Sequence, residues 1–125
     1  MIYTVTLNPA LDKTVEIPGM ALDTVNRITE MRTDPGGKGI NVSKVIAKLG
    51  GESRAVGILG GESGKMLEKL LEHENFTTRF RFVEGQTRTN IKIIDREGHT
   101  NTDINEPGLT VTDADLNALL NDLLA

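Results

Sequence analysis

The stretch Pro35-Gly36-Gly37-Lys38-Gly39-Ile40-Asn41 lies between an extended segment and an amphipathic helical pattern. Its three glycines within four positions let the backbone approach a ligand closely. A helix that begins here points unpaired N–H groups and the positive end of its dipole into the loop, which favours a polar or anionic ligand. Lys38 adds a cation and Asn41 an amide. The stretch predicts a site for a hydroxylated, phosphate-bearing small molecule; the alternative is a tight turn that only precedes a helix.

A strand–helix–strand unit is predicted around this loop. The helix after the loop is indicated by apolar residues at helical spacing, which we expect to face the core: Val42, Val45, Ile46 and Leu49. Residues 2–7 predict one strand, and the continuous apolarity of residues 54–59 is typical of a strand covered on both faces. A second helix, capped by Ser63, is expected to end near residues 74–75. The unit favours an α/β fold with a mainly parallel sheet.

Further short extended segments are predicted at residues 13–17, 27–33, 78–83, 89–94 and 100–105. The first two are typical of a small, half-exposed accessory sheet, and the last two of a hairpin. Asp12 is expected in a loop before them. Thr112 and Asp115 form a capping box for a last helix that runs to Ala125 without a stop signal. Because a parallel sheet needs helices over both faces and few are predicted, we expect the chain to be part of a larger protein.

Composition narrows the classes of function. The net charge of −4 and the pI near 5.2 argue against a nucleic-acid-binding or membrane-binding surface. The chain of 125 residues contains no cysteine, which excludes disulfides and thiolate metal sites and is compatible with a reducing compartment. No targeting signal is visible, so a cytoplasmic location is expected. His73 and His99 have no partners at metal-ligand spacing, so no protein metal site is predicted.

Two further groups of residues are candidates for ligand contact. Asp12 follows the first strand, where an α/β fold presents its ligand crevice, and a carboxylate there can accept hydrogen bonds from sugar hydroxyls; the alternative is an Asx-turn. Arg88, Asn90 and Lys92 alternate along one face of a predicted strand. They are either a phosphate-binding fork or a solvated strand face. Arg27 could add a second guanidinium to such a phosphate-binding fork; the alternative is that Arg27 is an ordinary surface residue.

Two well-known glycine motifs do not match. Gly64-Lys65 lacks both the earlier glycine and the following Ser or Thr of the P-loop. Gly37-Lys38-Gly39 is followed three positions later by Val42, where the dinucleotide fingerprint has glycine. The sequence therefore offers no nucleotide-binding motif of either type.

Five motifs in order resemble those of the PfkB (ribokinase-like) carbohydrate kinases: Asn8-Pro9-Ala10-Leu11-Asp12, residues 36–43, residues 57–61, residues 87–92 and residues 103–108. The likeness covers essentially the whole chain. It implies a ribokinase-like α/β fold, of which residues 1–125 are the N-terminal portion: a βαβ core of a mainly parallel sheet with a small β lid near residues 13–33 and 89–105. Within the family, the chain is most similar to kinases of fructose 1-phosphate, with kinases of tagatose 6-phosphate as close relatives.

The resemblance implies a substrate site formed by Asp12, Gly37, Lys38, Asn41, Arg88, Asn90 and Arg27. Asp12, the backbone at Gly37 and Asn41 would hold sugar hydroxyls. Arg88 with Asn90 would hold the substrate phosphate. Lys38 and Arg27 would be supporting cations, with Arg27 reaching the site of a neighbouring subunit.

The same resemblance implies phosphorylation of a ketose phosphate by ATP with Mg²⁺, and a homodimer formed through the lid sheet. The family's catalytic Asp and nucleotide site belong to a glycine-rich region that this chain lacks, so the chain alone is expected to be inactive. Three alternatives stay open. The acceptor could be tagatose 6-phosphate or fructose 6-phosphate, it could be an unphosphorylated sugar or nucleoside, or the chain could be a catalytically silent binding or dimerisation module.

Overall fold

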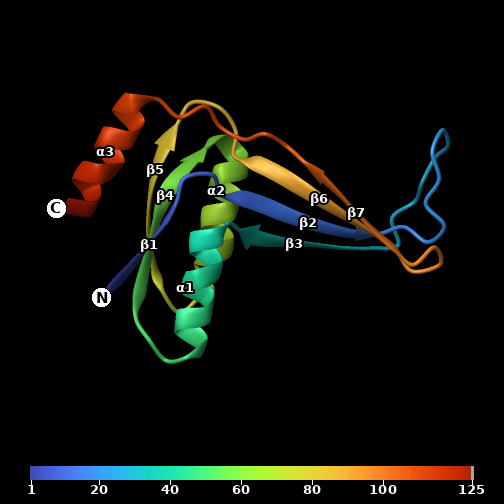
Figure 1. Ribbon diagram of the computed structural model, residues 1–125, viewed down its shortest axis with the longest axis horizontal. Helices are drawn as coiled ribbons and strands as arrows, with labels where there is room; N and C mark the ends of the chain where they lie inside the picture. The colour runs from blue at the N-terminus through green and yellow to red at the C-terminus, as the bar shows by residue number, and fades with distance from the viewer. Residues whose placement is uncertain (125) are drawn as a thin grey trace.

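The computed structural model describes residues 1–124 as two sheets and three helices (Figure 1). In chain order the elements are β1 (Ile2–Thr6), β2 (Ala10–Glu16), β3 (Glu30–Gly36), α1 (Lys38–Lys48), β4 (Ser53–Gly60), α2 (Gly61–Leu71), β5 (Thr77–Val83), β6 (Arg88–Asp95), β7 (Thr100–Asn105) and α3 (Asp113–Leu124). A parallel three-stranded sheet has the order β1-β4-β5. A four-stranded sheet has the order β3-β2-β6-β7. The predicted α/β fold is confirmed.

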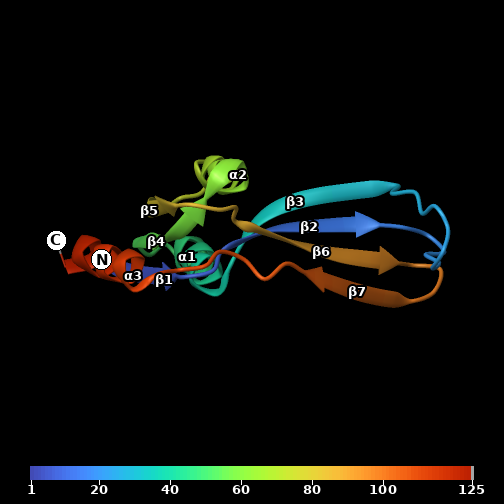
Figure 2. The same ribbon diagram turned by 90° about the horizontal axis from the view of Figure 1, so that it is seen from above.

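The four-stranded sheet extends away from the rest of the molecule, and we call it the lid sheet (Figure 2). Helices α1 and α2 cover one face of the three-stranded sheet, and α3 lies on the other face (Figures 1 and 2). In the lid sheet β2 pairs parallel with β6, whereas β3 and β7 pair antiparallel at the two edges. The predicted hairpin of residues 89–94 and 100–105 is therefore confirmed.

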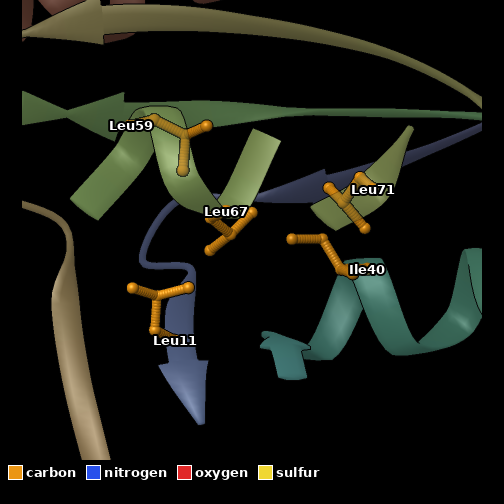
Figure 3. Packing of buried hydrophobic residues seen from close by; sticks show 5 residues of the cluster. All are labelled: Leu11, Ile40, Leu59, Leu67 and Leu71. Carbon is orange, nitrogen blue, oxygen red and sulfur yellow. The ribbon is translucent and has the colours of Figure 1, made fainter. Parts of the chain in front are cut away.

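The main apolar cluster joins the lid sheet to the helical layer (Figure 3). Its buried members are Leu11, Ile40, Leu59, Leu67 and Leu71. Leu11 comes from β2, so the base of the lid sheet packs into the core that α1, α2 and β4 form. Burial of each such side chain contributes about 1.5–3 kcal/mol, which anchors the lid strands to the core.

The expected buried face of α1 was wrong. The helix buries Ile40 and Ser43. Of the four expected residues, Ile46 is half-buried, while Val42, Val45 and Leu49 are 50%, 54% and 82% exposed. The reason lies in β1, which presents threonines to the helix: Ser43 Oγ lies 2.7 Å from Thr4 Oγ1. A small hydroxyl residue fits against that polar strand face, and the side chains of Val42 and Val45 are left exposed.

Two expectations about the lid sheet need correction. Asp12 lies inside β2 rather than in a loop, because β2 runs unbroken from Ala10 beside β6. β3 spans Glu30–Gly36, so Arg27 falls outside it, in the segment that joins β2 to β3 at the far end of the lid sheet (Figure 1). Pro9 lies in the short junction between β1 and β2. It has no N–H to donate to a strand ladder, but β2 begins at the next residue.

The helix ends agree in part with the expectations. Ser63 does not cap α2, which begins at Gly61; its hydroxyl instead donates to the carbonyl of Thr87 at 2.7 Å. α2 ends at Leu71, earlier than expected. The capping box of α3 is confirmed: the Asp115 N–H donates to Thr112 Oγ1 at 3.2 Å, and the Thr112 N–H donates to Asp115 Oδ2 at 3.0 Å.

A carboxylate ties together the far end of the lid sheet. Asp95, only 6% exposed, accepts backbone N–H bonds from Gly98 at 3.0 Å, Gly19 at 2.9 Å and Met20 at 3.0 Å. The bonds from Gly98 and Gly19 stabilise the ionised form and hold the pKa of Asp95 below its ordinary value. The loop after β2 and the β6–β7 turn are therefore joined through one charged group.

Candidate functional site

The glycine loop packs so closely against β1 and β2 that side chains do not fit. Gly37 caps α1 with φ at 131°, a conformation that L side chains rarely adopt. A Cβ on Gly36 would collide with the carboxylate of Asp12, and one on Gly39 would collide with Thr6. Thr6 Oγ1 also accepts the N–H of Ile40 at 3.1 Å, which satisfies one donor of the first helical turn. The glycines thus bring the start of α1 against the strand that carries Asp12.

A cavity of about 490 Å³ opens where α1 meets the lid sheet. Asp12 from β2, Asn41 from α1 and Asn90 from β6 all line it. The other lining residues are Lys13, Thr14, Arg32, Asp34, Pro35, Lys44, Ile91, Lys92, Asp103 and Asn105. A wall so rich in carboxylates, amides and cations suits a hydroxylated ligand that carries charge.

One polar atom in this cavity has no partner. Asn90 Oδ1 is buried and accepts no hydrogen bond from the described residues. Leaving such an acceptor unsatisfied costs about 1–3 kcal/mol, so a donor from a ligand is favoured there. Asn90 lies directly beside Asp12 in the parallel β2–β6 ladder, which places the amide and the carboxylate on the same face.

Arg88 lies in a second hollow, not in the main cavity. This hollow, of about 300 Å³, is also lined by Asn8, Lys38 and Gly39. An Arg88 guanidinium nitrogen donates to the carbonyl of Asn8 at 3.1 Å, whereas its Nε is buried and has no partner among the described residues. Two cations, Lys38 and Arg88, therefore meet beside the N-terminus of α1, an arrangement that favours an anion.

The predicted site residues are thus distributed over two neighbouring hollows and one distant position. Asp12, Asn41 and Asn90 share the main cavity, and Lys38 and Arg88 share the smaller hollow. Gly37 joins them as the cap of α1. Arg27 is exposed in the segment between β2 and β3 and lines neither hollow, so this chain does not bring it to the other residues.

Sequence reasoning missed several polar residues of the main cavity. Strand pairing brings Asp34 and Asp103 to the wall of the main cavity. Asp34 on β3 lies opposite Asp12, and Asp103 on β7 lies opposite Lys92. That register is not visible in a sequence without the strand order. Lys44 could have been found, since it follows Asn41 by three positions on the same helix; its Nζ donates to the Pro35 carbonyl at 2.5 Å.

A larger hollow of about 840 Å³ lies between the end of β5 and α3. Its lining includes Phe82, Val83, Ala114 and Ala118, and it contains none of the predicted site residues. Its lining also includes Arg81, Glu84, Thr110, Thr112 and Asp115. Because it contains none of the residues that the sequence predicts for ligand contact, we assign the candidate site to the two hollows that do.

Comparison with known proteins identifies the family. The profile of the pfkB family carbohydrate kinases matches residues 5–122. The chain belongs to the PfkB family. A curated relative, the 1-phosphofructokinase of Rhodobacter capsulatus, is 39% identical over 127 residues; the match spans 99% of this chain and 40% of that protein. The chain therefore spans about two fifths of the length of the curated PfkB relatives it matches, and it corresponds to their N-terminal part.

Solved PfkB structures share the fold. A possible 1-phosphofructokinase from Thermotoga maritima superposes with a TM-score of 0.87 at 46% identity, over 98% of this chain and 40% of that one. Phosphofructokinase-2 from Escherichia coli in complex with fructose-6-phosphate superposes with a TM-score of 0.91 at 32% identity, over 98% of this chain and 41% of that one. The predicted ribokinase-like fold is confirmed.

Two features were sought in residues 1–124 and not found. These residues bring together no group of three or more His, Cys, Asp or Glu side chains that could hold a metal ion. Likewise, none of the helices described for this stretch is both long and apolar enough to cross a membrane.

Proposed function

We propose that this chain forms the sugar-phosphate-binding part of a kinase that transfers phosphate from ATP to fructose 1-phosphate, giving fructose 1,6-bisphosphate. The observation that carries the proposal is the cavity shared by Asp12, Asn41 and Asn90, beside the hollow that holds Lys38 and Arg88. Family membership and the similarity to 1-phosphofructokinases support this activity over that of other sugar kinases.

Each site residue has a role that suits its chemistry. The Asp12 carboxylate accepts hydrogen bonds from sugar hydroxyls, and the Asn90 Oδ1 atom accepts a further one. Asn41 can both donate to and accept from the sugar, while the backbone at Gly37 lets it approach closely. Arg88 and Lys38 neutralise the phosphate, with the unpartnered Arg88 Nε as a donor.

The described residues do not fit a nucleotide or Mg²⁺. They include no cluster of possible metal ligands, and the sequence lacks a P-loop or dinucleotide motif. We therefore assign ATP, Mg²⁺ and the catalytic base to the part of the PfkB fold that these residues do not span. On its own the chain would bind a sugar phosphate without phosphorylating it.

We also place the protein in the cytoplasm as a homodimer that pairs through the lid sheet. The six residues of β7 at one edge of that sheet are all exposed, so the edge is free to pair. Arg27 lies at the far end of the lid sheet, which would let it reach a partner's substrate instead of its own. The absence of cysteine is compatible with the reducing cytoplasm.

Calorimetric titration of the chain tests the substrate class. We expect fructose 1-phosphate to bind more tightly than tagatose 6-phosphate or fructose 6-phosphate, and fructose to bind most weakly. An ADP-release assay on the same chain should show no turnover. Tighter binding of fructose 6-phosphate would favour the substrate held by the E. coli relative. Equal or absent binding of all four sugars would instead favour a binding or dimerisation module and refute the proposal.

A matched pair of variants tests the role of Arg88. Arg88→Ala removes a charge-assisted hydrogen bond of about 1.5–3 kcal/mol, so we expect the Kd for fructose 1-phosphate to rise roughly 10- to 150-fold. Arg79→Ala on β5 is the control, because Arg79 is exposed and lines neither hollow. An unchanged Kd in Arg88→Ala would remove Arg88 from the phosphate site.

A further inference from the structure

Arg88, the first residue of β6, has a strand partner on one side only. In the β2–β6 ladder it lies beside Ala10. The pairing of β6 with β7 begins later along the strand, where Asn90 lies opposite Asn105. The end of a strand opens easily where it has a partner on one side only, so the backbone at Arg88 needs other contacts to hold its side chain in place.

The residue before Arg88 is held by the core. Thr87 is 2% exposed, and its hydroxyl oxygen accepts the N–H of Gly60 at 2.9 Å. The Thr87 N–H donates in turn to the Gly60 carbonyl at 2.9 Å. The Ser63 hydroxyl donates to the Thr87 carbonyl at 2.7 Å. The backbone before Arg88 is therefore tied to the end of β4 and to the first turn of α2.

The residue after Arg88 is held by Glu106. The antiparallel register that places Asn90 opposite Asn105 would, if continued, place Thr89 opposite Glu106. β7 ends at Asn105, and a carboxylate oxygen of Glu106 accepts the Thr89 N–H at 2.6 Å. The side chain of Glu106 thus takes the place of the next strand partner, after the main chain has left the sheet.

The Glu106 carboxylate leaves the guanidinium of Arg88 free. The two residues line the same small hollow of about 210 Å³, yet Arg88 takes part in none of the ion pairs found within residues 1–124. The buried Nε of Arg88 also has no hydrogen-bond partner in that stretch. A carboxylate paired with Arg88 would compete with an anionic ligand, whereas one oriented by a backbone N–H does not.

We infer that Glu106 is a positioning residue for the proposed phosphate site and that Ser63 acts with it. Glu106 holds Thr89 and Ser63 holds Thr87, so the backbone on both sides of Arg88 is fixed before an anion binds. Neither side chain lines the smaller hollow, so both act through Arg88. Glu106 has this role only if an anion binds at Arg88, so the assignment rests on the proposed function.

Variants of Glu106 separate a positioning role from an effect of charge. Glu106→Ala removes the acceptor of the Thr89 N–H, whereas Glu106→Gln keeps an acceptor oxygen and removes only the charge. The ligand must order this backbone itself in Glu106→Ala, so we expect the Kd for fructose 1-phosphate to rise about two- to tenfold. In Glu106→Gln it should change by less than about twofold. An effect of charge alone predicts the opposite, because both variants would then bind the phosphate more tightly.

Two further variants complete the calorimetric titration. Ser63→Ala removes the donor to the Thr87 carbonyl, so the Kd should again rise about two- to tenfold. Glu84→Ala is the control and should bind as the wild type does, because Glu84 is exposed and lines neither hollow. Urea unfolding of each variant identifies conditions in which all of them are folded, so that lost stability does not imitate lost affinity. If Glu106→Ala does not fold, Glu106→Met replaces it, since methionine keeps the length of the side chain without an oxygen acceptor.

Two measurements show whether Glu106 acts through Arg88. In a chain that already carries Arg88→Ala, Glu106→Ala should weaken binding no further, because substitutions that act through one group are not additive. Amide exchange at Thr89 gives a second readout that needs no sugar. In the ligand-free chain it should be about fivefold faster or more in Glu106→Ala and change by less than about twofold in Glu106→Gln.

The outcomes distinguish the role of Glu106 from the proposed function. Unchanged or tighter binding in Glu106→Ala would overturn the inference while fructose 1-phosphate binding by the wild type left the proposed function intact. A loss in Glu106→Ala that adds fully to that of Arg88→Ala would do the same. An unchanged Kd in Ser63→Ala would remove Ser63 from the assignment. If the wild type prefers another sugar phosphate, the variants are titrated with that ligand and the same results are expected. A wild type that binds no sugar phosphate would refute both.

Discussion

Replacing Gly36 by alanine should weaken sugar binding while leaving the fold almost intact. The three heavy atoms nearest to a Cβ at this position all belong to the carboxylate of Asp12. The carboxylate is the end of a rotatable side chain, so it can turn away where a backbone atom could not. The substitution therefore acts on the orientation of a ligand-binding group, and the orientation of Asp12 is what the proposed sugar site depends on.

The size of each effect follows from this contact. Forcing Asp12 off its preferred rotamer destabilises the folded state by about 0.5–1.5 kcal/mol. Alanine also restricts the unfolded chain more than glycine does, which stabilises the folded state by about 0.4–1 kcal/mol. The free energy of unfolding should therefore change by less than about 1 kcal/mol. Losing hydrogen bonds that sugar hydroxyls donate to a charged acceptor costs about 1.5–3 kcal/mol, which raises the Kd for fructose 1-phosphate roughly 10- to 150-fold.

The assay combines calorimetric titration with urea unfolding of the same variants. Gly50→Ala is the control: Gly50 has φ at +83° and no atom within 4 Å of an added Cβ. It should lose about 1–2 kcal/mol of stability through backbone strain and keep the wild-type Kd. Binding loss in one glycine variant and stability loss in the other would separate the two effects.

A double-mutant cycle provides the decisive result. If Gly36→Ala acts by displacing Asp12, then it should weaken binding no further in a chain that already carries Asp12→Ala. Two substitutions that act through the same group are not additive, whereas independent ones add to within about 0.3–0.5 kcal/mol. Additive losses in the cycle would refute the proposed contact between the glycine loop and the sugar-binding carboxylate.

Three other predictions concern the fold. Leu67→Ala in the main core should lower the free energy of unfolding by about 2–5 kcal/mol in urea titration, because Leu67 is fully buried. The pKa of Asp95 is lowered in the folded state, so the free energy of unfolding of the wild type should fall as the pH drops below about 3.9, the ordinary pKa of Asp, and on through the lowered pKa of Asp95. Asp95→Asn should remove this part of the acid dependence in thermal melts from pH 6 to 2. Thr112→Ala should destabilise α3 by about 0.5–2 kcal/mol, measured as faster amide exchange in that helix.

Local patterns predicted much of this molecule because local forces produce them. The capping box of Thr112 and Asp115 and the glycine start of α1 depend on neighbours within a few residues. Asp103 could not be assigned to the cavity from its neighbours in the sequence. It lines the cavity because β7 pairs with β6, which places Asp103 opposite Lys92. Arg27 shows the limit from the other side: the resemblance suggested a supporting role at a neighbouring subunit's site, and in this chain Arg27 lies in the segment between β2 and β3 and does not line the cavity.

The error about α1 is the most informative difference between prediction and structure. The helical repeat of Val42, Val45 and Leu49 is a real signal of burial, yet these side chains are exposed among the described residues. Such a repeat reflects the contacts of the whole fold, and this chain corresponds to about two fifths of its relatives. β1 was correctly predicted as a strand, but its sequence pattern does not reveal that it stands at a sheet edge. β1 could be predicted from its own residues, whereas the face that α1 buries depends on the threonine side chains that β1 presents to it.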